Sequence, residues 1–186
     1  MFFRSLSRRG FLKTSMTVAS TLLTVPRGIA GIRRDEGRQV GRLSLYNTHN
    51  GERLSVTFRD TAGNYDRDAL NALNWILRCH YTNEATSMHA NIIEFLNRTD
   101  NMLGGDNELH IISGYRSPCY NNILRGKGRG VARNSLHLSG RAIDVAIPGH
   151  HIENIKKAAL GLRMGGVGYY PGAGFVHLDS GAFRTW

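Results

Sequence analysis

SLHLSGRAID at residues 135–144 and FVHLD at residues 175–179 are the stretches of this 186-residue chain that decide its fold. Polar and apolar residues alternate toward the end of both stretches, which is the pattern of a β-strand with one buried face. In the first strand the alternation places Asp144 on the face opposite the large apolar side chains. In the second it places His177 and Asp179 on that open face. The two strands would therefore present His and Asp together.

With His137, which lies seven residues before Asp144, these side chains form a candidate metal site made of His137, Asp144 and His177. Two imidazoles and one carboxylate are the usual ligands of a hydrolytic zinc, because they leave a position for a water that zinc acidifies toward a pKa of ~7. Calcium or magnesium would require more oxygen ligands. The chain has only two Cys, which excludes a four-cysteine zinc site. Spacing alone equally fits a surface pair or a buried structural histidine.

The remaining pattern predicts an α+β fold, a single domain with a mainly antiparallel sheet flanked by helices. Alternating residues at 43–46 and 54–58, separated by an Asn-Gly turn, predict a β-hairpin. Asp66 and Ser87 are the capping residues at which two supporting helices are expected to begin. Further strands are expected at 109–112, 142–147, 166–170 and 175–178, and further helices near 121–125 and at 152–162.

The first thirty residues hold much of the positive charge. The chain has 24 Lys and Arg against 14 Asp and Glu, a formal net charge of +10, and five of those bases but no acid lie in residues 1–30. SRRGFLK at residues 7–13 leads into a short apolar run and the small residues 28–30, which looks like a twin-arginine export signal. The run is too short and too polar for a membrane span of ~20 residues; a basic helix lying on a membrane is the alternative.

This organisation assigns residues 1–30 to a twin-arginine signal peptide, 31–41 to a charged linker and 42–186 to one folded domain. The mature domain would lie in the periplasm without a stable membrane span, and the twin-arginine export machinery would be a partner. Cys79 and Cys119 would meet an oxidising compartment there, where they either pair or remain buried thiols.

Residues 109–143 contain no acid but several bases interleaved with Gly: Arg116, Arg125, Lys127, Arg129, Arg133 and Arg141. Such a segment beside the proposed metal would attract an anionic polymer, although a solvated loop with no ligand has the same composition. Nucleic acid is disfavoured as a partner, because no aromatic stacking platform accompanies these bases and the export signal removes the chain from the cytoplasm.

A family resemblance rests on SGYRS at residues 113–117, on His137 with Asp144 seven residues later, on GGVGYY at 165–170 and on FVHLD at 175–179. In this order and spacing they resemble the YcbK-type (MepK) murein endopeptidases of the zinc D-Ala-D-Ala peptidase group, whose fold is shared with the hedgehog signalling domain. The resemblance runs from about Arg42 to Trp186. It implies one Zn²⁺ held by His137, Asp144 and His177. It also implies that Arg116 faces the substrate and stabilises the oxyanion of the tetrahedral intermediate.

One departure from the family concerns the general base. Many relatives carry a carboxylate three residues before the last zinc histidine, where this chain has Gly174. Asp179 is the candidate here, because it shares a strand face with His177 at ~7 Å along the chain. It activates the metal-bound water, orients His177, or only accepts a structural hydrogen bond. Ser135 and Asn121 could orient ligands or substrate, or act as ordinary caps.

The resemblance implies a zinc-dependent murein endopeptidase that hydrolyses peptide cross-links of peptidoglycan in the periplasm. A D-Ala-D-Ala carboxypeptidase is one alternative, and a non-catalytic, zinc-containing wall-binding module is another. The stem peptides of peptidoglycan carry free carboxylates, which suits the basic segment. Two cross-links remain open as substrates: D-Ala to diaminopimelate, and diaminopimelate to diaminopimelate.

Overall fold

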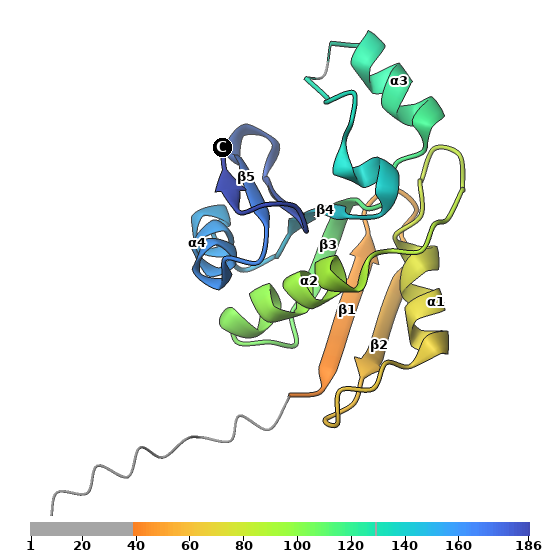
Figure 1. Cartoon of the computed structure of the whole chain (residues 1–186). Helices are drawn as coiled ribbons and strands as arrows, with labels where there is room; N and C mark the ends of the chain where they lie inside the picture. The colour runs from red at the N-terminus through yellow and green to blue at the C-terminus, as the bar shows by residue number, and fades with distance from the viewer. Residues whose placement is uncertain (1–38, 129) are drawn as a thin grey trace, which may run out of the picture. The chain divides into compact units, whose positions relative to one another are not determined.

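The structure is a computed structural model that describes residues 39–128 and 130–186. The predicted export signal and most of the predicted linker lie outside these residues. The described chain is an α+β unit built on a seven-stranded sheet with the strand order β2-β1-β3-β4-β6-β5-β7 (Figure 1). None of the helices in this part of the chain is long and apolar enough to cross a membrane.

The N-terminal part of the sheet contains the predicted hairpin. β1 (Gly41–Asn47) and β2 (Arg53–Arg59) are antiparallel, and Asn50-Gly51 lies in the turn between them. β3 (Glu108–Ser113) then pairs with β1 in parallel. β2 runs opposite to both of these strands, and the connection from β2 to β3, which contains two helices, carries the chain past β1 to its other edge.

The C-terminal part of the sheet contains the strands predicted around the candidate ligands. β4 (Ala142–Ala146) is antiparallel to β3 and to β6 (Phe175–Asp179), and β6 is antiparallel to β5 (Gly166–Tyr170). The short β7 (Arg184–Thr185) pairs with β5 in parallel. The sheet is therefore mixed, and the prediction of a mainly antiparallel sheet is wrong. Alternation within a strand predicts its buried face but not the direction of its neighbour.

Two helices support the sheet from the first half of the chain. α1 (Arg67–Ile76) begins as predicted, with the Asp66 side chain accepting a hydrogen bond from the Ala69 amide. α2 (Ala90–Met102) is capped by His89. The prediction that this helix begins at Ser87 is wrong. The amides of residues 88 and 89 donate instead to the Asn74 side chain and the Gly140 carbonyl, which keeps the chain extended through His89.

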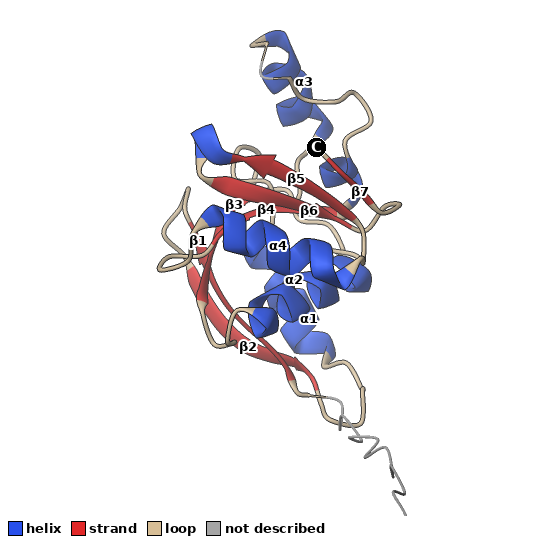
Figure 2. Ribbon diagram, turned by 90° about the vertical axis from the view of Figure 1, so that its left-hand side faces the viewer, coloured by secondary structure: helices blue, strands red, loops and turns tan. Residues whose placement is uncertain are grey.

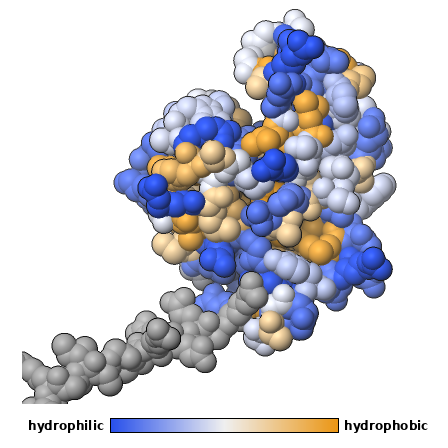
Figure 3. Space-filling view, in the orientation of Figure 1, coloured by the Kyte–Doolittle hydropathy of each residue, from blue (hydrophilic) through white to orange (hydrophobic). Residues whose placement is uncertain are grey.

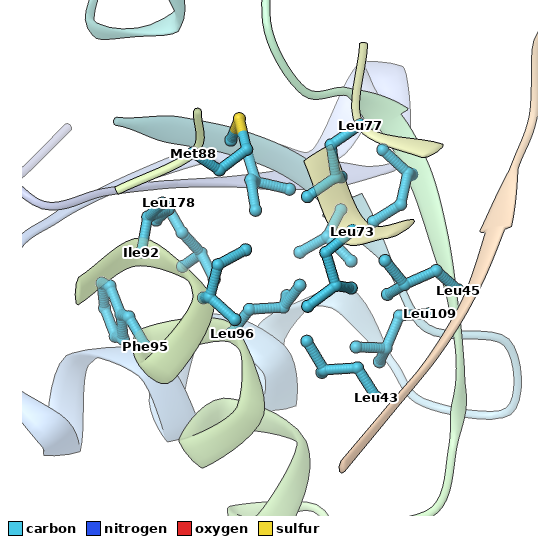
Figure 4. Packing of buried hydrophobic residues seen from close by; sticks show 14 of the residues in the cluster. Leu43, Leu45, Leu73, Leu77, Met88, Ile92, Phe95, Leu96, Leu109 and Leu178 are labelled. Atoms are coloured by element: carbon cyan, nitrogen blue, oxygen red, sulfur yellow. The ribbon is translucent and has the colours of Figure 1, made fainter. Parts of the chain in front are cut away.

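The helices α1, α2 and α4 (Ile152–Leu162) lie on one face of the sheet (Figure 2). Between them and the strands lies the core, of which Figure 4 shows a part: Leu43, Leu45, Leu73, Leu77, Met88, Ile92, Phe95, Leu96, Leu109 and Leu178. α3 (Pro118–Gly126) stands away from the sheet in Figure 1, and Asn121 is its one buried residue. Since the apolar side chains of β4 and β6 face the helices, the alternate side chains of these strands are directed to the opposite face.

Candidate metal centre

His137 reaches the open face of the sheet from a short 3-10 helix, η1 (Leu136–Ser139), that leads into β4. η1 ends at Gly140, whose φ of 63° and close approach to the Ser87 carbonyl both require the absence of a side chain. The buried His137 ring donates from Nδ1 to the Gly114 carbonyl at 2.7 Å. This hydrogen bond leaves Nε2 with its lone pair directed toward the sheet.

The other two candidate ligands, Asp144 and His177, lie side by side on neighbouring strands, because the register of β4 and β6 pairs them. His177 Nδ1 lies 2.7 Å from Asp144 Oδ1 and 3.2 Å from His137 Nε2. His137 Nε2 lies 3.3 Å from Asp144 Oδ1. A tetrahedral zinc with ligand distances of ~2.0–2.1 Å separates its ligand atoms by about 3.3 Å. Two of the three separations match this value, and the third, between His177 Nδ1 and Asp144 Oδ1, is a hydrogen-bond distance that a bound zinc would widen.

Both histidines have a hydrogen-bond partner on the side away from this cluster. His137 Nδ1 donates to the Gly114 carbonyl, and His177 Nε2 lies 3.2 Å from Asp179 Oδ2. Histidines that bind metals almost always donate their second ring N–H to a carbonyl or a carboxylate, which fixes the ring and its tautomer. The hydrogen bonds of His137 and His177 are therefore those expected of histidines that bind a metal.

The electrostatics of the cluster favour a bound cation. Burial acts to raise the pKa of Asp144, but the facing imidazoles of His137 and His177 outweigh it and hold that pKa well below its usual range. Burial acts in the same way on Asp179, but hydrogen bonds from His177 and Arg184 hold its pKa low as well. Burial lowers the pKa of His177, whereas the carboxylates of Asp144 and Asp179 raise it above its usual value. Two ionised carboxylates therefore face one imidazole.

Arg116 lies beside the cluster with its guanidinium buried in the pocket wall. Its Nη2 is 3.7 Å from Asp144 Oδ2 and 3.4 Å from the Ser113 hydroxyl, and its Nη1 is 3.5 Å from Asn121 Oδ1. Its Nε is buried and has no hydrogen-bond partner among residues 39–128 and 130–186. Burial lowers the pKa of Arg116, although Asp144 acts in the opposite direction. A guanidinium held by long, incomplete contacts retains donors for an oxygen of a ligand.

A pocket of about 350 Å³ opens above the candidate ligands. Figure 3 shows the surface hollowed between the part that carries α3 and the part that carries β5. One wall comes from the segment after α3, with Gly130, Val131, Ala132, Asn134 and Ser135. The other wall comes from the C-terminal strands, with Tyr170, Phe175, Arg184 and Trp186. Exposed Arg125, Lys127 and Arg133 place positive charge on and next to the first wall.

The structure brings the predicted site residues together. His137, Asp144 and His177 form a group able to hold a metal ion, with ligand atoms within 4.8 Å of one another. Arg116 and Asp179 lie beside this group.

Ser135 and Asn121, whose roles the sequence leaves open, differ in their contacts. The Ser135 side chain makes no capping hydrogen bond at η1. Asn121 accepts from Arg116 and donates to the Ala132 carbonyl at 3.3 Å, so it links the arginine to the pocket wall. The two cysteines are free thiols, with Cys79 buried and Cys119 exposed.

Sequence reasoning missed Arg184. Its Nη2 lies 2.7 Å from Asp179 Oδ2, and its guanidinium stacks over the Trp186 ring at 4.8 Å. β7 spans two residues, too few for any alternation to be visible. The signal available in the sequence was a base, Arg184, five residues after the candidate Asp179.

Comparisons with known proteins identify the family of this chain. The family described as peptidoglycan L,D-endopeptidase MepK matches residues 35–186. The peptidoglycan L,D-endopeptidase MepK of Escherichia coli strain K12 is 43% identical over 144 residues, which cover 77% of this chain and 79% of the relative. The probable peptidoglycan L,D-endopeptidase MepK of Haemophilus influenzae is 40% identical over 145 residues, which cover 77% of each chain. The chain therefore belongs to the peptidoglycan L,D-endopeptidase MepK family of peptidases.

Proposed function

We propose that this chain is a zinc-dependent murein endopeptidase whose single Zn²⁺ is held by His137, Asp144 and His177. The observation that carries the proposal is the set of ligand-atom separations, 2.7 to 3.3 Å, at the base of an open pocket. The hydrogen bonds of the two imidazoles to Gly114 and Asp179 support it, because they leave the ligand nitrogens facing one point. Two imidazoles and one carboxylate are a common ligand set of hydrolytic zinc.

Zinc bound there supplies Lewis acidity toward a peptide carbonyl and lowers the pKa of a coordinated water. Arg116 then has the role of an oxyanion donor: its guanidinium lines the pocket beside Asp144, and its Nη contacts of 3.4 to 3.7 Å are long enough to give way to a substrate oxygen. Asp179 has the role of a positioning residue, since its carboxylate accepts hydrogen bonds from Arg184 and from backbone amides besides its contact with His177. This saturation favours orientation of His177 over proton transfer.

The substrate we propose is a cross-link between two peptidoglycan stem peptides. The relatives are named L,D-endopeptidases, and the bond between two diaminopimelate residues joins an L centre to a D centre. Stem peptides carry free carboxylates, and the exposed Arg125, Lys127 and Arg133 place positive charge beside the pocket. The open pocket suits a branched polymer better than a small enclosed ligand.

Peptidoglycan lies outside the inner membrane, and we propose that the twin-arginine pathway exports this chain to the periplasm. SRRGFLK at residues 7–13, followed by a short apolar run, supports this route. A metal-containing domain that is folded before export suits such a pathway.

The test is digestion of purified sacculi by the zinc-loaded and the chelated protein, followed by chromatography of the muropeptides. Zinc-dependent conversion of cross-linked dimers to monomers is the expected result. Loss of terminal D-alanine alone would instead identify a carboxypeptidase. An unchanged profile from protein that holds zinc and sediments with sacculi would identify a wall-binding module.

A further inference from the structure

The Asp179 carboxylate is fully buried and is surrounded by hydrogen-bond donors. Its Oδ1 accepts from the amide of Gly166 at 3.3 Å, from the amide of Gly181 at 2.8 Å and from Arg184 Nη1 at 3.1 Å. Its Oδ2 accepts from Arg184 Nη2 at 2.7 Å and lies 3.2 Å from His177 Nε2. Arg184 therefore holds both oxygens in a bidentate pair, and the oxygen that faces His177 is also its closest contact.

Strand register explains how an exposed edge residue reaches a buried carboxylate. Across the sheet, Asp179 of β6 pairs with Gly166 of β5, and Gly166 pairs with Arg184 of β7. One strand therefore separates the acid from the base. Only a residue without a side chain at position 166 allows the guanidinium to pass over β5 and meet the carboxylate.

Two glycines, Gly166 and Gly181, leave the space that the Asp179–Arg184 pair occupies. A Cβ at Gly166 would lie 2.4 Å from Asp179 Oδ2 and 2.6 Å from Arg184 Nη1. A Cβ at Gly181 would lie 2.8 Å from Asp179 Oδ1 and 3.1 Å from Arg184 Nη1. Neither position has a positive φ, so the close approach, and not backbone conformation, is what requires Gly there.

We propose that Arg184 is a positioning residue of the metal centre: through Asp179 it fixes the ring and tautomer of His177, so that β7 is a part of the site. The inference rests on the proposed zinc site. Its observations are the contacts of Arg184 and Asp179, which are independent of the ligand separations. Arg184 does not touch the three candidate ligands, and its effect on them passes through the carboxylate.

A purely structural role of Arg184 would act through stability alone, and a measurement of zinc affinity on folded protein separates that role from positioning. The Arg184 side chain is 45% exposed, and its remaining contacts are the Ala182 carbonyl and the face of Trp186, which is itself 48% exposed. Asp179, in contrast, is fully buried, so the loss of Arg184 would also lower the stability of the fold. Asp179 would keep its two backbone amides in an Arg184 variant and would lose the donors that fix the oxygen facing His177.

The experiment is a competition between the full chain and a chromophoric chelator for zinc, with Arg184→Gln, Arg184→Lys and wild type compared at one pH. We expect Arg184→Gln to weaken zinc affinity about 10-fold, the lower end of the range for removal of a direct partner of a ligating histidine, because Arg184 acts through Asp179. Arg184→Lys should recover part of that loss, because an ammonium can bond Oδ2 but cannot hold both oxygens. Thermal unfolding of the metal-free proteins checks that all three are folded at the temperature of the competition.

Arg163→Gln is the matched control, since Arg163 stacks on Phe183 of the same C-terminal segment and does not touch Asp179. It removes the same charge and should keep wild-type zinc affinity. Wild-type affinity in Arg184→Gln would overturn the inference while leaving the proposed function intact. Equal losses in Arg184→Gln and Arg163→Gln would also overturn it, because general charge would then be the cause. A wild-type chain that binds no zinc would overturn both proposals.

Discussion

Arg116 is the positive side chain closest to the candidate ligands, and its contacts suggest that it is held for a ligand. Its guanidinium contacts are 3.4 to 3.7 Å long, and its Nε has no partner in the described part of the chain. We predict that Arg116→Lys lowers kcat about 100-fold or more, because a donor to the developing oxyanion is lost while the charge beside Asp144 stays. Zinc content should not change.

The control for Arg116→Lys is Arg98→Lys, an exposed position on α2. It makes the same chemical change on a helix that covers the other face of the sheet and should leave kcat unaltered. Steady-state kinetics on a purified cross-linked muropeptide measures both variants. Loss of zinc from Arg116→Lys would show that Arg116 instead serves to hold the metal centre together.

His177 controls how zinc binding depends on pH. Burial lowers its pKa, but the carboxylates of Asp144 and Asp179 outweigh burial and raise it above the ordinary imidazole value of ~6.5. Protons compete with zinc for Nδ1 of His177. We therefore predict that zinc affinity falls as the pH is lowered, and that this fall begins at a pH above the ordinary imidazole pKa. Asp144 and Asp179 stay ionised there because their pKa values are lowered.

The metal-free protein should show the opposite trend. A raised folded-state pKa contributes stability that is present below the unfolded-state pKa and is lost as pH rises through the folded-state pKa. The unfolding temperature of the chelated protein should therefore decline as the pH increases from about 6 through the raised pKa of His177. Zinc titrations and thermal unfolding over one pH series measure both trends. A zinc affinity independent of pH would contradict the assignment of His177 as a ligand.

At the scale of the elements, close packing of β5 against β6 positions the Asp179 carboxylate. A Cβ at Gly166 would lie 2.4 Å from Asp179 Oδ2, and the carboxylate is fully buried, so it has little room to move. We predict that Gly166→Ala destabilises the fold by about 1–3 kcal/mol through overpacking and weakens zinc binding as well.

Gly172→Ala is the matched control for Gly166→Ala. Gly172 lies in the turn before β6, and a Cβ there would meet no atom within 4 Å. Urea unfolding and zinc competition of the two variants provide the comparison. If Gly166→Ala binds zinc like wild type, zinc binding does not depend on the observed position of the Asp179 carboxylate.

The sequence predicts most elements near the site because their apolar periods are regular. β5 and α4 have the predicted ends, at 166–170 and 152–162. The ligand face follows from alternation alone, since the apolar side chains of β4 and β6 lie in the core. Strand direction and the cap of α2 depend on contacts far apart in sequence, such as the bond from the His89 amide to the Gly140 carbonyl. Local pattern does not contain these contacts.

The candidate site was predictable to a similar extent. The ligands and Arg116 lie in motifs whose residue types point to chemistry. Arg184 became part of the site through a register of three strands, in which Gly166 lies between it and Asp179. A two-residue strand at the sheet edge has no pattern from which such a register could be read.

At the scale of the whole molecule, we propose separate tasks for the basic N-terminal segment and the folded domain. Arg8 and Arg9 carry the proposed export signal. We predict that changing both to Lys retains precursor in the cytoplasm, because the twin-arginine pathway reads the arginine pair and not merely its charge. Fractionation and immunoblotting measure the distribution, with Arg4→Lys as the control outside the pair. Normal export of the double variant would contradict this route.

The pocket joins segments that are distant in the chain, since one wall follows α3 and the other contains β7. A substrate that lies across it would contact both walls and the ligands beneath. We therefore expect hydrolysis by this domain to require the strands, the segment after α3 and the proposed metal together.

The most direct test of the central claim uses two purified muropeptide dimers, one linked from diaminopimelate to diaminopimelate and one linked from D-Ala to diaminopimelate. Each is incubated with the zinc-loaded protein, the chelated protein and His177→Ala, and the products are separated by chromatography. We expect only the zinc-loaded protein to split the diaminopimelate–diaminopimelate dimer into monomers. Added zinc should restore the activity of the chelated protein but not that of His177→Ala. Equal cleavage by His177→Ala, or an intact dimer with fully zinc-loaded protein, would contradict the central claim.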